Sequence, residues 1–233
     1  MKLLLENGAD VNAEGGELGN ALQAASDGGY EPIVKLLLET GADVNAKGGF
    51  YGSALQAASC NGHKPIVKLL LENGADVDAE GGEYGNALQA ASYTGHESIV
   101  KLLLEKGADV NAEGEELGNA LQAASYEGHE PIVKLLLENG ADVNAKGGEY
   151  GSALQAASYK GDDPIVKLLL ENGADVNAEG GKYRNALQAA LSKGHKEIVK
   201  LLLDKGAEGE NAVQAASESR VDREAAAGGG VYQ

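Results

Sequence analysis

Two kinds of hydrophobic segment alternate along the chain, and the pair returns every 33 residues. One segment reads Ala-Leu-Gln-Ala-Ala-Ser, with a single leucine among small residues, and the other reads Ile-Val-Lys-Leu-Leu-Leu. Because five of the six residues in the second segment are apolar, we expect neighbours to cover it on more than one side. Fixed self-similarity at this period, without insertions, indicates a stacked array of repeats.

Local signals place the ends of two short helices in each unit. An Asn or Ser precedes the first segment and a Gln stands at the third helical position, which is the spacing of a capping box. The cap residues are Asn20, Ser53, Asn86, Asn119, Ser152, Asn185 and Asn211. The left-handed conformation that glycine allows predicts the end of this helix at residues such as Gly95. All four internal prolines fall in the first turn of the second helix, where no amide hydrogen bond is lost.

The segment after the second helix predicts a projection from the array. Ala-Asp-Val-Asn-Ala alternates apolar and polar residues, and a glycine-rich turn follows it. Alanine lines one helix layer and leucine the other, so neighbours should approach more closely on the alanine side. We therefore expect an all-α fold: a curved solenoid of stacked helix pairs with projecting β-hairpin or turn fingers, and with fingers and short helices on the concave side.

The array should form a single domain over residues 1–227. Within it we expect a truncated first repeat at 1–19, six helix pairs opening at 20, 53, 86, 119, 152 and 185, and a shortened terminal repeat at 206–227. Residues 228–233 should form a frayed tail. Leu3, Leu4 and Leu5 have no partner helix before them, so this uncapped end is a candidate for self-association or for contact with a flanking region.

The order of turn, short helix, Gly-His loop, Ile-Val-Lys-Leu-Leu-Leu helix and Gly-Ala-Asp-Val-Asn-Ala resembles the ankyrin repeat from Met1 to about Ser217. Where the common ankyrin pattern has Thr-Pro-Leu-His, this chain has Asn/Ser-Ala-Leu-Gln. The resemblance implies a protein-binding module whose partners touch the end of the first helix and the finger tip. The Gly-Asn-Ala-Leu-Gln-Ala-Ala-Ser variant is similar to repeat tails of fungal NACHT-type receptors, which implies the sensor region of a larger intracellular receptor.

The net charge indicates which classes of partner this chain can bind, and the cysteine content indicates in which compartment it can fold. The net charge of −17 opposes binding to nucleic acid or to anionic membrane, and it favours a protein with a basic or neutral surface. No apolar run approaches the ~20 residues that span a bilayer. A single cysteine, Cys60, allows folding in a reducing compartment and predicts an intracellular protein, cytoplasmic or nuclear. We expect Cys60 to be a free surface thiol.

Variation between copies concentrates in columns that should face the concavity. Seven of the nine tyrosines occupy two of these columns, and an adjacent column is mostly acidic. Tyrosine offers a rigid apolar face with a polar tip, which suits recognition surfaces. The predicted partner-binding residues are Tyr51, Tyr84, Tyr93, Tyr126, Tyr150, Tyr159, Tyr183, Glu83, Glu116 and Glu149, with Tyr84, Tyr93, Tyr126 and Tyr150 at the centre. The alternative is that the rings stack on one another and only stiffen the array.

The sequence supports a catalytic site or a metal site less well than it supports a partner-binding surface. His63, His96, His129 and His195 recur once per repeat, too far apart to share a metal whose ligand atoms lie at ~2 Å. We expect these histidines to cap the second helix. The exposed glutamate column is better explained by solvation than by a paired-carboxylate mechanism, and the glycine turns lack a phosphate-binding Lys-Ser or Lys-Thr. No enzymatic activity, cofactor or metal is predicted.

A second hypothesis of another class remains open. The near-identity of the copies favours an engineered or excised ankyrin repeat array with no physiological ligand. Departures such as Asp78, Arg184 and Leu191 favour natural divergence.

Overall fold

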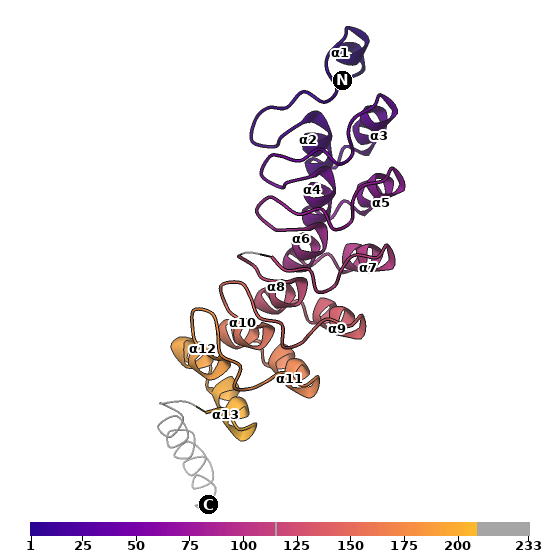
Figure 1. Ribbon diagram of the computed structural model, residues 1–233. Helices are drawn as coiled ribbons and strands as arrows, with labels where there is room; N and C mark the ends of the chain where they lie inside the picture. The colour runs from indigo at the N-terminus through magenta and orange to yellow at the C-terminus, as the bar shows by residue number, and fades with distance from the viewer. Residues whose placement is uncertain (115, 209–233) are drawn as a thin grey trace, which may run out of the picture.

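The computed structural model describes residues 1–114 and 116–208 as a curved stack of helix pairs (Figure 1). The predictions for Asn211, for most of 206–227 and for 228–233 concern residues outside these ranges. A single short helix, α1 (Lys2–Glu6), precedes six pairs, each made of an inner and an outer helix. This is the all-helical solenoid that the 33-residue period predicts.

The inner helices begin directly after the expected cap residues. They are α2 (Ala21–Asp27), α4 (Ala54–Cys60), α6 (Ala87–Thr94), α8 (Ala120–Glu127), α10 (Ala153–Lys160) and α12 (Ala186–Lys193). The reciprocal capping box is complete in α2, α6 and α8, whose caps are Asn20, Asn86 and Asn119. In α4, α10 and α12 the cap side chain accepts from the backbone amide of the glutamine, but the glutamine side chain does not bond back to the cap, so the capping-box spacing gives only half of the box in these three.

The outer helices are uniform in length because they share one sequence. They are α3 (Glu31–Glu39), α5 (Lys64–Glu72), α7 (Glu97–Glu105), α9 (Glu130–Glu138), α11 (Asp163–Glu171) and α13 (Lys196–Asp204). In α5, Ile66, Val67 and Leu70 are fully buried, while Leu69 and Leu71 are half-buried. Burial of such a residue contributes roughly 1.5–3 kcal/mol, so this layer supplies much of the cohesion between repeats.

The curvature follows from the size of the side chains in the two layers. Consecutive inner helices contact each other far more extensively than consecutive outer helices do. Alanines such as Ala57, Ala90 and Ala123 are fully buried between inner helices and allow this close approach. The stack bends toward the inner helices and the loops beside them, which confirms the predicted concave side (Figure 1).

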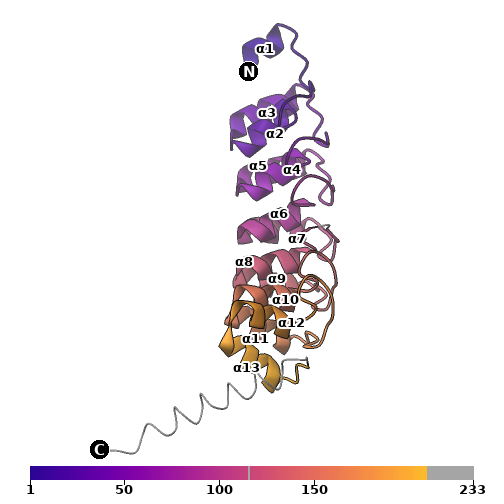
Figure 2. The ribbon, with the colours of Figure 1, turned by 90° about the vertical axis from the view of Figure 1, so that its left-hand side faces the viewer.

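The loop before each inner helix forms a finger, and the fingers stand in one row along the array (Figure 2). We number them first to sixth: residues 14–19, 47–52, 80–85, 113–118, 146–151 and 179–184. Isolated antiparallel bridges close several of them, for example Gly48 with Gly52 and Gly147 with Gly151. The described fingers are therefore tight turns with at most one bridge, and the turn form of the predicted finger is the one observed.

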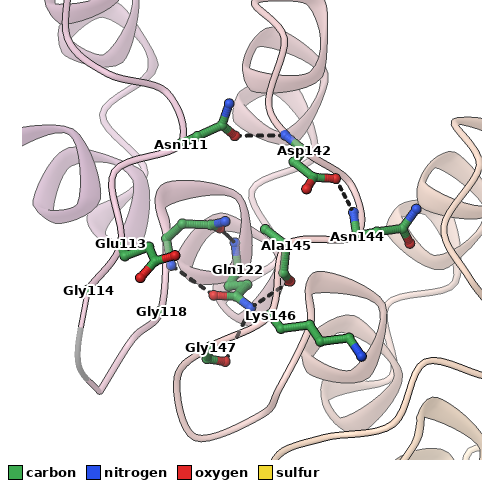
Figure 3. A pocket seen from close by; sticks show the side chains of 11 residues that line it. Asn111, Glu113, Gly114, Gly118, Gln122, Asp142, Asn144, Ala145, Lys146 and Gly147 are labelled. Carbon is green, nitrogen blue, oxygen red and sulfur yellow. Dashed lines mark hydrogen bonds between the residues drawn. The ribbon is translucent and has the colours of Figure 1, made fainter.

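Asparagine and glutamine side chains tie each repeat to the next. Asn111 Oδ1 accepts from Asp142 N at 2.8 Å, and Asn111 Nδ2 donates to Gly140 O at 3.2 Å. Gln122 Nε2 donates to Ala145 O, just before the following finger, and to Gly147 O within it, both at 3.2 Å (Figure 3). The same glutamine completes the cap of α8, so one side chain fixes both a helix start and the position of the next finger.

The histidines join repeats and do not cap helices. His96 stands at the N-cap of α7, but its side chain makes no capping hydrogen bond. Its Nε2 instead lies 3.0 Å from Cys60 O in the preceding repeat, and the ring packs on Gly62. The capping prediction was wrong because the imidazole reaches back across the interface. Asp162, which replaces histidine in one repeat, does cap its helix by accepting from Ile165 N at 3.0 Å.

The amino-terminal helix has little cover. Leu3 and Leu4 of α1 are 71% and 61% exposed, as expected for an outer helix without an inner partner. Throughout residues 1–114 and 116–208, every helix is too short or too polar to cross a lipid bilayer.

Candidate functional site

The concave face is built from the carboxyl-terminal ends of the inner helices and from the finger tips. Tyr93, Tyr126 and Tyr159 lie at the helix ends, whereas Tyr51, Tyr84, Tyr150 and Tyr183 lie in the fingers. All seven side chains are half-buried. Their rings contact one another across repeats, so the structure brings the predicted tyrosines together in two clusters.

The first cluster contains Phe50, Tyr51, Tyr84 and Tyr93. The rings of Tyr51 and Tyr84 stack at 6.3 Å between centroids, and those of Tyr84 and Tyr93 lie 5.6 Å apart. Phe50 meets Tyr51 edge-on at 5.0 Å. Burial of the hydroxyl, helped by the neighbouring Cys60 thiol, raises the pKa of Tyr84 to about 12. This ring therefore stays neutral well above the ordinary titration range of tyrosine.

The second cluster contains Tyr126, Tyr150, Tyr159 and Tyr183. Tyr126 stacks on Tyr150 at 4.7 Å, and Tyr159 stacks on Tyr183 at 4.8 Å. Tyr150 and Tyr159 connect these two pairs at 5.1 Å. The rings stack on one another, as the alternative interpretation expected, and such aromatic pairs are worth about 0.5–1.5 kcal/mol beyond burial.

Lysines accompany the second cluster. Lys160 Nζ lies 4.1 Å from the centroid of the Tyr126 ring, and Lys193 Nζ lies 4.5 Å from that of Tyr159. A hydrogen bond from Lys193 lowers the pKa of Tyr159, and the bond between them raises the pKa of Lys193. These lysines were missed in the sequence because they are identified only by their register. Lys160 stands 33 residues after Glu127, a spacing that places the two side chains on adjacent repeats.

The predicted glutamates Glu83, Glu116 and Glu149 are exposed on successive finger tips. Only Glu149 has a cationic partner among the described residues, Lys182 Nζ at 2.8 Å. The face is thus acidic at the third and fourth fingers and carries lysines toward the carboxyl-terminal repeats.

Cys60 is buried, at 8% exposure, so the expectation of a surface thiol was wrong. The tyrosine of the next repeat, Tyr84, covers it and shares a hydrogen bond with it. Desolvation raises the pKa of the thiol. The column position alone could not reveal this cover because it comes from a neighbouring finger.

A cleft of about 470 Å³ lies between the fourth and fifth fingers (Figure 3). Its polar residues include Asn111, Gln122 and Asn144, whose side chains already bond to backbone groups. These groups hold the repeats together. Across 1–114 and 116–208, no cluster of three or more His, Cys, Asp or Glu side chains is arranged to hold a metal ion.

The comparisons with known proteins agree with this architecture. The family model for ankyrin repeats (3 copies) matches residues 22–114, 55–147, 113–180 and 153–226. This chain belongs to the ankyrin repeat family. The crystal structure of the human ASB11 ankyrin repeat domain is similar, with a TM-score of 0.74 and 29% identity over 89% of this chain and 91% of that one. No curated protein matches the sequence.

Ankyrin repeats are generally protein–protein interaction modules, and the fold is typically a non-enzymatic scaffold. In this ankyrin array the residues that differ most between copies lie at the finger tips and at the ends of the inner helices. The repeated residues, such as Gln122 and Asn111, hold the scaffold.

Proposed function

We propose that this ankyrin array is a non-enzymatic scaffold that recognises another protein through its concave face. The observation that supports it is the line of seven half-buried tyrosines at finger tips and helix ends. The contact surface comprises Tyr51, Tyr84, Tyr93, Tyr126, Tyr150, Tyr159, Tyr183, Glu83, Glu116 and Glu149. The carboxylates favour a partner with a basic or neutral surface.

The energetics support such a role. Tyrosine contributes a large contact area with only two side-chain torsions to fix. Here the rings are already held by their neighbours, for example Tyr126 against Tyr150 at 4.7 Å, so a partner orders them at small entropic cost.

The biological setting is proposed from the sequence. The likeness of the Gly-Asn-Ala-Leu-Gln-Ala-Ala-Ser units to repeat tails of fungal NACHT-type receptors supports the sensor region of a larger intracellular receptor, in the cytoplasm or nucleus. The single cysteine is compatible with a reducing compartment.

The proposal is tested by quantitative affinity capture from cell lysate. The bait carrying Tyr84, Tyr93, Tyr126 and Tyr150 all changed to alanine should lose the proteins that the parent captures. Tyr30→Ala is the matched control, because Tyr30 is 57% exposed and lies at the start of α3, outside both tyrosine columns. Circular dichroism and thermal unfolding must show that the quadruple variant is folded.

Two results would contradict the proposal. One is equal capture by the parent and by a folded quadruple variant. The other is the absence of any protein enriched by the parent over the quadruple variant, which favours the second hypothesis of an array without a physiological ligand.

A further inference from the structure

The tyrosines of the concave face recur at a constant distance. Tyr126 and Tyr159, at the ends of consecutive inner helices, have ring centroids 6.4 Å apart and planes inclined by only 12°. Tyr150 and Tyr183, on consecutive fingers, have centroids 6.3 Å apart and planes inclined by 15°. In each column the rings are therefore nearly parallel, and they advance by 6.3–6.4 Å per repeat.

The two columns interleave into one series of rings, which we call the tyrosine ladder. Tyr150 lies between Tyr126 and Tyr159, at centroid distances of 4.7 Å and 5.1 Å. Tyr183 follows Tyr159 at 4.8 Å. All four rings are half-buried and held by their neighbours, so the spacing is fixed before a partner binds.

This spacing matches an extended polypeptide. A β-strand rises about 3.2–3.4 Å per residue, so side chains on one of its faces recur every ~6.4–6.8 Å. One face of a polyproline II helix recurs every ~9.3 Å, and successive turns of an α-helix are ~5.4 Å apart. Tyr51 and Tyr84, in the second and third fingers, show the same 6.3 Å as the ladder. An extended segment along this face therefore presents two residues to each repeat, and every second side chain meets the tyrosines.

Lysines flank the tyrosine ladder. Lys160 Nζ lies 4.1 Å from the centroid of the Tyr126 ring, and Lys193 Nζ lies 4.5 Å from that of Tyr159. The residue one repeat before Lys160 is Glu127, at 3.8 Å, whereas the residue one repeat before Lys193 is Lys160 itself. Among residues 1–114 and 116–208, Lys193 bonds to the Tyr159 hydroxyl and has no carboxylate within ion-pair distance.

A small residue follows the ladder in the sixth pair. Ser192 stands at the end of α12, where α8 and α10 have tyrosine. Its side chain is exposed, and its hydroxyl donates to Ala189 O of the same helix at 2.7 Å. Within the described part of the chain, Tyr183 therefore has no ring of its own repeat beside it, and Lys193 stands exposed next to Ser192.

We propose that the tyrosine ladder binds an extended segment of a partner protein, with every second side chain on the tyrosines and an aspartate or glutamate paired with Lys193. The incoming carboxylate takes the place beside Lys193 that Glu127 has beside Lys160. The complementary charge is required only at this end of the segment, because the acidic fingers lie toward the amino-terminal repeats. This inference rests on the proposed function, since it names the conformation and charge of the segment that the same face recognises.

The test begins with selection of short random peptides displayed on phage against the full chain. The strongest binder is synthesised, titrated by fluorescence anisotropy and then scanned with alanine. Affinity should fall at every second residue of the peptide, and one of the sensitive residues should be aspartate or glutamate. Sensitive residues spaced by three or four, as in a bound helix, or by three, as in polyproline II, would overturn the extended assignment.

Lys193→Gln tests the ion pair. It should weaken binding of the peptide about two- to fivefold, as expected for an exposed pair. Lys167→Gln, which removes an exposed charge from the outer helix α11, is the matched control and should leave the affinity unchanged. Lys193→Glu should weaken binding further, and changing the acidic residue of the peptide to lysine should restore it. Unchanged affinity in Lys193→Gln, or no restoration in the charge-swapped pair, would overturn the role of the carboxylate.

Tyr159→Ala separates this inference from the proposed function. It removes one ring of the ladder and should weaken binding about tenfold or more, whereas Tyr159→Phe keeps the ring and should lose much less. If peptides depend on Tyr159 but show helical spacing and ignore Lys193, the concave face binds protein and this inference is wrong. If no peptide is recovered, this inference fails, and the capture experiment decides the proposed function separately. Binding that is indifferent to Tyr159→Ala in a folded variant would contradict both.

Discussion

Asn45 and Asp78 occupy the same place in successive repeats, yet only Asn45 is bonded to the next repeat at two points. Asn45 Oδ1 accepts from Asp76 N at 2.8 Å, and its Nδ2 donates to Gly74 O at 3.0 Å. Asp78 has no donor in its ionised side chain and makes only the first kind of bond, from Asp109 N at 2.9 Å. The replacement of one amide nitrogen by a carboxylate oxygen therefore removes one of the two bonds that join successive repeats at this place.

Replacing Asp78 with asparagine should stabilise the array. The new amide can donate to Gly107 O and keeps the existing acceptor, so we expect a gain of about 0.5–1.5 kcal/mol in the free energy of unfolding. Urea denaturation followed by circular dichroism measures it. The reciprocal change Asn111→Asp removes the bond to Gly140 O and should lose a similar amount; equal stability of both variants and the parent would refute the role of the bond.

Gln89→Met should be strongly destabilising. Gln89 Oε1 accepts from Asn86 N at 2.8 Å, and its Nε2 donates to Ala112 O and Gly118 O in the next repeat. Their loss leaves buried polar groups unpaired, at a cost of about 1–3 kcal/mol. Gln188 is half-buried and does not accept from its cap residue, because Asn185 N donates to Tyr183 O at 2.8 Å instead. Gln188→Met should therefore cost less than Gln89→Met. Comparable losses in the two variants would contradict this explanation.

Gly181→Ala and Gly173→Ala should differ, although both glycines have positive φ. A Cβ at Gly173 meets nothing within 4 Å, so only backbone strain of about 1–2 kcal/mol is expected. A Cβ at Gly181 would lie 2.3 Å from Tyr150 C and would have to separate the fifth and sixth fingers. Thermal unfolding should therefore show the larger loss for Gly181→Ala, and the reverse order would argue against stacked fingers.

Tyr84 should make the protein less stable at high pH. Its pKa is raised to about 12 in the folded protein from an ordinary value of 10.0, so between these values the unfolded chain releases the proton and the folded chain keeps it. The contribution of Tyr84 to the free energy of unfolding is fully present below pH 10 and is lost as the pH rises toward 12. Denaturation midpoints on either side of pH 10 should differ less in Tyr84→Phe than in the parent. An identical decrease in both would exclude this contribution.

The helical layers were predictable because their determinants are local. The capping pair of Asn86 and Gln89 predicts where α6 begins, and Gly95 takes the left-handed conformation at its end. The difference in size between alanine and leucine layers was also sufficient to predict the direction of curvature, because the same difference recurs in every repeat.

Contacts between repeats were harder to predict because each depends on register across an interface. The same imidazole, His96, could satisfy a helix terminus or a carbonyl of the preceding repeat, and only the packed arrangement selects Cys60 O. Cys60 was taken as exposed because its cover, Tyr84, comes from the next finger.

Hydrogen exchange by mass spectrometry, with and without a protein that the parent captures from lysate, tests most directly whether recognition resides on the concave face. The account predicts that the bound protein protects backbone amides in the fingers and at the ends of α6, α8 and α10. The outer helices α7, α9 and α11 should be unchanged and serve as the internal reference. Protection confined to those outer helices would contradict the account.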